Sequence, residues 1–372
     1  MSAGCVVSAQ AAASCGSLQV PVLFPEQGST DGGNCPAGDN RAEQDVSTQS
    51  IDTTAGALGW RMFSWSVTFL TFAFLLNNFL TYWAGLPGAA AALSGGGAAA
   101  WVQLLMYPVA IALGVMMVQR SRALALRADA ARFYAVTAFI IRWAFFSVLL
   151  VGLADAIISL LRVEGVLENV VGTNIAGELG RPQFRGLWLH IPLCVVSIAL
   201  AAMFRRTLGF IWLSLLVVIA ELLIVFTRFI FSYEQAYMGD LVRFWYAALF
   251  LFASAYTLIE EGHVRVDVLY AGFPERRKGL VNHWGSILLG MTLCAVIMWF
   301  GMEGKASIIN SPLLNFEVSQ SGFGMYTKYM MAGFLAVFAV SMMIQFAGYL
   351  LEAIADRRGE PGKREVANPG GH

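Results

Sequence analysis

A charged string interrupts the apolar part of this chain. It reads EEGHVRVDVLY, residues 260–270, and it stands between two long apolar runs. If the string is helical, His263 and Asp267 share one face and Arg265 points elsewhere; if it is extended, all three side chains line one side. Neither arrangement is catalytic. We expect either an interfacial anchor that sets the depth of the preceding helix, or a contact with a protein partner or with anionic lipid.

Two further ionisable residues, Arg142 and Glu221, lie inside apolar runs long enough to cross a bilayer. A charge at the centre of a membrane helix costs about 2.5 to 3.5 kcal/mol on insertion scales, and it marks a functional position by default. At 1.5 Å per residue, Arg142 lies about 12 Å and Glu221 about 20 Å into spans entered from the same side. An ion pair between them would join the two halves of the chain. Two alternatives stay open: a protonated Glu221 that faces another helix, or a contact with a partner subunit.

Arg228 and Asp240 flank the turn between two later apolar runs. Both are expected near the outer membrane face, where they would pair with each other or meet a partner. A pair at an exposed surface contributes little stability, so its value would be orientation.

The residue patterns of common catalytic and cofactor sites do not occur. The sequence has no GxSxG elbow, no HExxH helix and no P-loop. Only His190 among the histidines lies inside an apolar run, whereas a bis-histidine haem site needs several. Cys5, Cys15 and Cys35 match no zinc or disulfide spacing. We therefore expect no enzyme activity, no metal and no cofactor.

The composition indicates a membrane protein. Hydrophobic residues make up 58% of the chain and charged residues 13%, about half the charged fraction of an ordinary soluble domain. The formal net charge is zero, so no basic surface points to nucleic acid as a partner. Because lipid offers the backbone no hydrogen bonds, the spans must be helical, and the expected fold class is an all-α polytopic membrane protein.

Apolar runs of spanning length, about 20 residues, predict about eight transmembrane helices. They cover approximately 60–83, 101–118, 134–161, 187–204, 208–231, 244–259, 282–302 and 329–354. Residues 1–55 are rich in Ser, Gly, Asp and Thr and are predicted to be a disordered tail, as are residues 357–372. The connection 162–186 mixes both charge signs with Gly and Pro and is predicted to be an exposed loop, with or without a short helix.

Arginine and lysine positions predict that both termini are cytoplasmic. With the N-terminus inside, the inside loops hold the richer sets, which are Arg120 to Arg132, Arg205 with Arg206, Arg265 with Arg276, Arg277 and Lys278, and Arg357, Arg358, Lys363 and Arg364. The outside loops are poorer and mostly offset by acids. The charged string 260–270 then lies at the cytoplasmic surface.

From about Leu208 onward the chain resembles the small permease (DctQ-type) subunit of tripartite ATP-independent periplasmic (TRAP) transporters. The matching strings are TRFIF at 227–231, with Phe229 where the family usually has Tyr; Asp240, where it usually has Glu, before the FWY cluster 244–246; and HVRVD at 263–267. The order of the three strings adds to the specificity of each. By this resemblance, residues 207–356 form a four-helix membrane domain, and residues 56–206 add four helices to which it does not extend.

The resemblance implies a role in a transport complex of the bacterial inner membrane. The expected partners are a large DctM-type permease subunit, which holds the substrate and sodium sites, a periplasmic substrate-binding protein, and membrane lipids. Arg228, Asp240, His263, Arg265 and Asp267 become candidates for subunit or lipid contacts. The alternative functions are a stand-alone carrier or channel and a membrane scaffold; inverted repeats with paired helix breaks, typical of carriers, are not evident.

Overall fold

Helices and loops, with no strand, make up the residues that the structure, a computed structural model, describes: 54–205, 210–233, 235–259, 270, 272–319 and 324–362. Within these ranges eight helical segments are long and apolar enough to cross a membrane. They are Gly56–Tyr82, Gly97–Arg120, Leu126–Val163, Pro182–Met203, Ile211–Phe231, Tyr237–Leu258, Glu275–Met302 and Lys328–Arg358. The prediction of an all-α protein with eight candidate membrane spans is confirmed.

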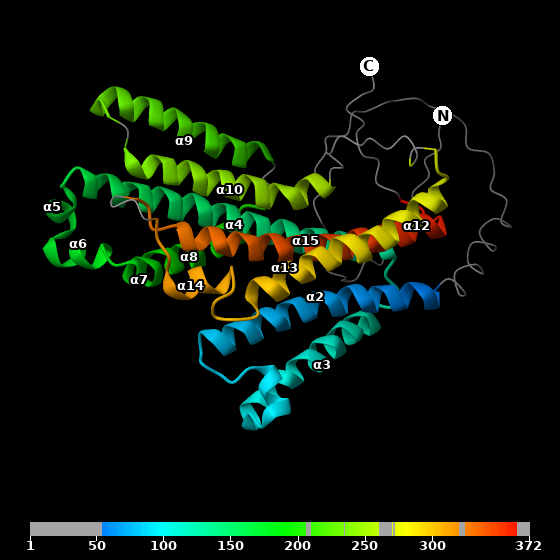
Figure 1. Ribbon diagram of the computed structural model, residues 1–372. Coiled ribbons are helices and arrows are strands. Elements are labelled where there is room, and N and C mark those ends of the chain that lie inside the picture. Colours follow the sequence, from blue (N-terminus) through cyan, green and yellow to red (C-terminus); the bar gives the residue numbers. More distant parts are fainter. Residues whose placement is uncertain are drawn as a thin grey trace, which may run out of the picture. The chain divides into compact units, whose positions relative to one another are not determined.

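The elements follow one another along the chain as labelled in Figure 1. In order they are α2 (Thr54–Tyr82), η1 (Ala89–Ser94), α3 (Gly97–Arg120), α4 (Leu126–Val163), α5 (Leu167–Val171), α6 (Thr173–Leu179), α7 (Pro182–Arg185), η2 (Gly186–His190), α8 (Ile191–Met203), α9 (Phe210–Phe231), α10 (Ala236–Ile259), α12 (Glu275–Gly285), η3 (Ser286–Met291), α13 (Thr292–Met302), α14 (Asn310–Asn315) and α15 (Lys328–Arg358). The segments η2 and η3 are π-helical turns inside otherwise continuous spans.

Helix α15 forms the centre of the described helices. Its apolar window is 67% buried, the highest value among the eight spans. It packs against α2 and α4 from the predicted additional region, and against α10, α12, α13 and α14 from the second half. The two halves of the chain therefore share one core.

Small residues allow the close approach of α15 to its neighbours. A Cβ atom at Gly348 would lie 2.7 Å from Tyr134 Cε1 and 3.1 Å from Phe133 Cβ of α4. On α2, the Ser64 hydroxyl donates a hydrogen bond of 3.3 Å to the carbonyl of Ala347. Contacts through small residues are typical of helix pairs in membranes, where van der Waals packing replaces the hydrophobic effect.

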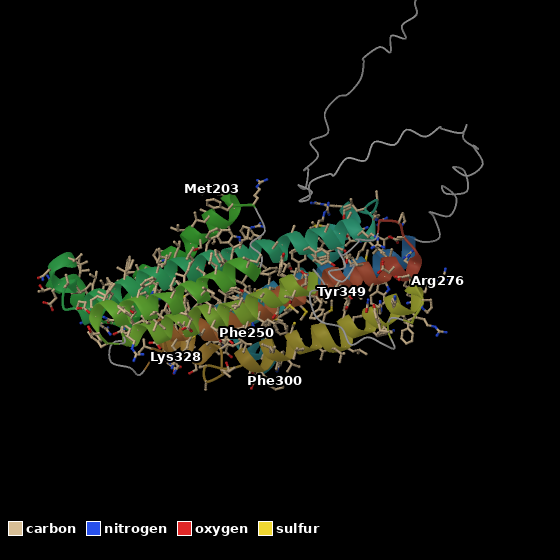
Figure 2. All side chains as sticks on the ribbon, turned by 90° about the horizontal axis from the view of Figure 1, so that it is seen from above. Met203, Phe250, Arg276, Phe300, Lys328 and Tyr349 are labelled. Carbon is tan, nitrogen blue, oxygen red and sulfur yellow. The ribbon has the colours of Figure 1, made fainter. Side chains whose placement is uncertain are left out.

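Charged residues gather at the two ends of these helices. Where α2 begins and α15 ends, Arg127 forms an ion pair of 2.7 Å with Asp356. Figure 2 shows Arg276, at the start of α12, and Lys328, at the start of α15, at opposite ends. Of the predicted inside residues, Arg127, Arg276 and Arg357 share one end of the described helices, and the side of the membrane that this end faces is a prediction.

The connection 162–186 is largely exposed, as predicted, but it holds three short helices and one buried arginine. It forms the short helices α5, α6 and α7, and the side chain of Arg185 is fully buried. The prediction of a simple exposed loop is wrong for this arginine because a buried carboxylate lies within its reach, in a helix 30 residues earlier.

Helix α8 ends beside the middle of α4. Phe204 leaves the helix with extended backbone, and its ring lies 5.7 Å from that of Phe146 on α4. Arg142 Nη1, one turn before Phe146, lies 3.5 Å from the carbonyl oxygen of Arg205. Arg205, predicted for an inside loop, thus lies level with Arg142, and Arg206 is outside the described residues.

Candidate functional site

A fully buried ion pair joins Asp155 of α4 to Arg185 of α7. Arg185 Nη1 lies 2.8 Å from Asp155 Oδ1, and both side chains are 0% exposed. Arg185 Nε also donates a hydrogen bond of 2.9 Å to the carbonyl of Leu179. Each buried ion loses several kcal/mol of hydration, roughly, so such a pair persists only where further hydrogen bonds satisfy its atoms. The surrounding residues supply such bonds to Asp155 and to Arg185 Nε, while Arg185 Nη2 is buried without a hydrogen-bond partner among the described residues.

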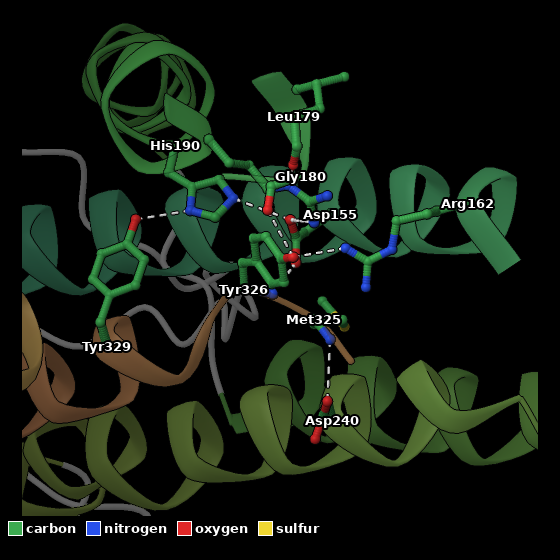
Figure 3. Close-up of polar contacts among 10 residues, drawn as sticks. Asp155, Arg162, Leu179, Gly180, His190, Asp240, Met325, Tyr326 and Tyr329 are labelled. Atoms are coloured by element: carbon green, nitrogen blue, oxygen red, sulfur yellow. Dashed lines mark hydrogen bonds and ion pairs between the residues drawn. The ribbon is translucent and has the colours of Figure 1, made fainter. Parts of the chain in front are cut away.

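The segment before α15 completes this site through Tyr326. Its backbone N–H donates a hydrogen bond of 2.6 Å to Asp155 Oδ2, and the Arg185 guanidinium lies 4.0 Å from the centre of its ring. Its hydroxyl donates to the carbonyl of Gly180 at 3.0 Å and accepts from Arg162 Nη1 at 2.7 Å. The second half of the chain is thereby fixed to α4 and to the connection 162–186 (Figure 3).

His190 links the ion pair to α15. Its Nε2 lies 3.3 Å from Asp155 Oδ1 and its Nδ1 lies 2.7 Å from the Tyr329 hydroxyl. A carboxylate only accepts hydrogen bonds, so in the neutral imidazole Nε2–H donates to Asp155 and Nδ1 accepts from Tyr329. The π-helical turn η2 ends at His190 with a bond from Ile191 N–H to the Gly186 carbonyl. Single π turns in helices occur often at functional positions.

Gly186 allows the helix carrying Arg185 and His190 to lie close to α14. A Cβ atom at Gly186 would lie 2.3 Å from Phe316 Cδ1 and Cε1, a distance that no side chain tolerates. The ring of Phe316 in turn lies 5.2 Å from that of Tyr329 in an edge-to-face contact. Glycine at 186 is therefore required by packing.

Asp240 of α10 forms a second contact with the segment before α15. Its Oδ2 accepts a hydrogen bond of 3.1 Å from Met325 N–H, and its Oδ1 accepts one of 3.4 Å from the Ser319 hydroxyl. Arg243, three residues later, lies 3.6 Å from Oδ1 and is 75% exposed. Asp240 therefore positions this segment, whereas Arg228 is exposed on α9 and no ion pair joins the two in the described part of the chain.

A second buried ion pair closes the opposite end of α4. Arg61 Nε of α2 lies 2.6 Å from Asp129 Oδ2, with 2% and 0% of the side chains exposed. Arg61 Nη2 donates to the carbonyl of Ser121 at 2.7 Å, and Nη1 donates to that of Arg122 at 3.2 Å. Arg61 thus holds the end of α3 and the start of α4 together.

The two ion pairs lie at the two levels expected for membrane interfaces. Asp129 and Asp155 are 26 residues apart on one helix, or about 39 Å at 1.5 Å per residue. A bilayer with its headgroup regions is about 40 to 45 Å thick. Arg142, halfway between them, then lies near the bilayer midplane.

The structure does not bring Arg142 and Glu221 together. Arg142 faces the end of α8, whereas Glu221 is exposed on α9, which packs against α10. Among the described residues no ion pair joins the two. The reason is packing: α9 contacts α10, and Glu221 lies on its exposed face rather than on a face turned to α4. His263, Arg265 and Asp267 lie outside the described residues.

Sequence reasoning missed the charged residues with the most contacts. Asp155 lies inside the predicted span 134–161, but it was not weighed as an intramembrane charge, and Arg185 was assigned to an exposed loop. Arg61, which lies inside the predicted span 60–83, and Asp129, which precedes the predicted span 134–161, belong to none of the predicted pairs. Asp155 itself was the available signal, because it stands among small and apolar residues, Gly152, Ala154 and Ala156. A carboxylate in such a run needs a partner.

The contacts of this site position helices. The described part of the chain contains no group of three or more His, Cys, Asp and Glu side chains that could hold a metal ion. Asp155, Arg185 and His190 bind one another and the backbone, and these contacts fix the helices against each other.

Comparison with known proteins gives one match. Residues 215–356 match the family model described as tripartite ATP-independent periplasmic transporters, DctQ component. No curated protein matches the chain, and no solved structure matches it. The match covers α10, α12, α13 and α15 and most of α9. Residues 215–356 therefore form a domain of the DctQ component of tripartite ATP-independent periplasmic transporters, with four further candidate membrane helices ahead of it.

Proposed function

We propose that this protein is the small membrane subunit of a TRAP-type secondary transporter in the bacterial inner membrane. It supports a large DctM-type permease subunit in the sodium-coupled uptake of organic acids that a periplasmic binding protein delivers. The observation that carries the proposal is the DctQ match over residues 215–356. The chain itself performs no reaction in this proposal.

The additional helices act as a brace for the DctQ-type domain. Helices α2 and α4 pack directly on α15, and Asp155 accepts a hydrogen bond from Tyr326 N–H at the entrance to α15. Asp240 holds the same segment from α10. A partner that docks on the DctQ-type helices would therefore meet a surface whose helix positions are fixed from both sides.

Reconstitution tests this proposal. The tagged chain is co-expressed with the large subunit from the same organism, purified, and placed in liposomes with a sodium gradient and the loaded binding protein. We expect the large subunit to co-purify and sodium-dependent uptake to need all three components. Uptake by this chain alone would contradict the proposal and favour a stand-alone carrier; absence of co-purification would contradict it as well.

A further inference from the structure

Glu221 is a carboxylate on the outer surface of a membrane helix. It lies on α9, and it is exposed, as are its neighbours Val218, Leu222 and Val225, which are 50–60% exposed. The apolar window of α9 is 17% buried, the lowest value among the eight candidate spans of the described residues. Most of this helix therefore faces away from the rest of the chain.

The depth of Glu221 follows from the hairpin of α9 and α10. Helix α9 ends at Phe231 and α10 begins at Ala236, so residues equally far from this turn lie side by side, and Glu221 lies beside Tyr246. The adjacent Trp245 donates a hydrogen bond of 3.2 Å to the Val148 carbonyl of α4. Glu221 is thus level with Val148.

This level is inside the hydrocarbon layer. Val148 is six residues from Arg142, which lies near the midplane, or about 9 Å at 1.5 Å per residue. The hydrocarbon core extends about 15 Å to each side of the midplane. Glu221 therefore presents a polar group to a layer that contains no water.

Glu221 needs a hydrogen-bond donor that the described part of the chain does not supply. No ion pair or hydrogen bond joins its carboxyl group to another residue in the described part of the chain. A charged carboxylate is costly in hydrocarbon, and a protonated one still has a hydroxyl and a carbonyl without partners. Intramembrane carboxyl groups therefore face protein or water in folded assemblies.

We propose that the face of α9 around Glu221 is the docking surface for a membrane helix of the large subunit, one that presents an arginine, lysine or other hydrogen-bond donor at the depth of Glu221. Val218, Leu222 and Val225 supply the apolar contact on both sides of the carboxyl group. The inference rests on the proposed function. It places the contact between this chain and the large subunit on the Glu221 face of α9.

The test compares co-purification of the large subunit with wild type, Glu221→Gln, Glu221→Leu and Leu105→Ala. Leu105 is the matched control, because it is 56% exposed on α3, which packs against α2 and η1. We expect Glu221→Leu to lower retention of the large subunit on the order of tenfold or more, Glu221→Gln to lower it less, and Leu105→Ala to leave it unchanged. The melting temperature of the isolated chain should stay the same in all four, because Glu221 is exposed there.

A photo-crosslinking residue at Leu222, in a chain that keeps Glu221, gives an independent readout. We expect a covalent product with the large subunit. Products with lipid or with a second copy of this chain only, or retention by Glu221→Leu equal to wild type, would overturn the assignment of this face while leaving the proposed function standing. Failure of the wild-type chain to retain the large subunit would overturn both.

Discussion

Arg185 and Asp155 form an ion pair of 2.8 Å in which both side chains are fully buried, and Tyr326 from the entrance to α15 covers it. The pair thus joins the helices ahead of the DctQ-type domain to that domain's central helix. Removal of one partner leaves the other charged, buried and unpaired, a situation that costs about 3 to 5 kcal/mol.

Asp155→Ala and Arg185→Met should each lower the free energy of unfolding by about 3 to 5 kcal/mol. The double variant Asp155→Leu/Arg185→Met should lose less than the sum, because it leaves no lone charge. Thermal or denaturant unfolding in detergent measures all three. Arg181→Ala is the control, since its pair with Glu178 is 72% and 40% exposed and contributes at most about 1 kcal/mol. If the double variant lost as much stability as the two single variants together, the two side chains would not be energetically coupled.

Gly186→Ala should destabilise the protein by about 1 to 3 kcal/mol. The new methyl group would lie 2.3 Å from the Phe316 ring, so η2 or the ring must move. Gly177→Ala is the control, because no atom lies within 4 Å of a Cβ there, and it should be neutral or stabilising. Phe316→Leu in the Gly186→Ala background should restore part of the melting temperature; if it does not, the Phe316 contact is not the cause.

Gly348→Ala should separate α15 from α4, at a cost of about 1 to 3 kcal/mol, because Tyr134 Cε1 lies 2.7 Å from the position of the added atom. Gly333→Ala on the same helix is the control, since its nearest neighbour is Leu313 Cδ2 at 3.6 Å. Melting temperatures of the two purified variants decide the point. Equal melting temperatures would show that the α4–α15 contact adapts without strain.

Reporter fusions should place both chain ends in the cytoplasm. In the described part of the chain, a Cβ atom at Gly56 would lie 3.8 Å from Arg358 Nη1, so α2 begins where α15 ends. The positive-inside rule puts that arginine-rich end inside. We expect alkaline phosphatase to be active when inserted after Gly177 and a C-terminal fluorescent protein to be bright. An inactive phosphatase after Gly177 together with a dark C-terminal fluorescent protein would show that the predicted topology is wrong.

Alkaline titration should report the hydrogen bond between Tyr233 and Glu164. The Tyr233 hydroxyl donates to Glu164 Oε1 at 2.9 Å, and this bond to a carboxylate raises the pKa of Tyr233 above its usual value of 10.0. A raised pKa means that the bond stabilises the folded protein below pH 10 and is lost as the pH rises through the higher folded value. The difference in tyrosinate absorbance between wild type and Tyr233→Phe should appear above pH 10. In Glu164→Gln the same transition should shift to lower pH.

The sequence by itself determined the all-α class, the eight candidate membrane spans and the family of the C-terminal part. These follow from the length of apolar runs, from the need to satisfy backbone hydrogen bonds in lipid, and from strings such as TRFIF and HVRVD. Each is a local property, so each can be read from neighbouring residues.

Only the tertiary structure decided which charges meet. Asp155 and Arg185 are 30 residues apart, and Arg61 and Asp129 are 68 apart, while Arg142 and Glu221 stay separate because Glu221 lies on the exposed face of α9, which packs against α10. Pairing across helices depends on where each helix starts, how deep it lies and which face it turns to its neighbour. A shift of one turn, about 5.4 Å, is enough to replace one partner by another, and no pattern along a single apolar run records that shift.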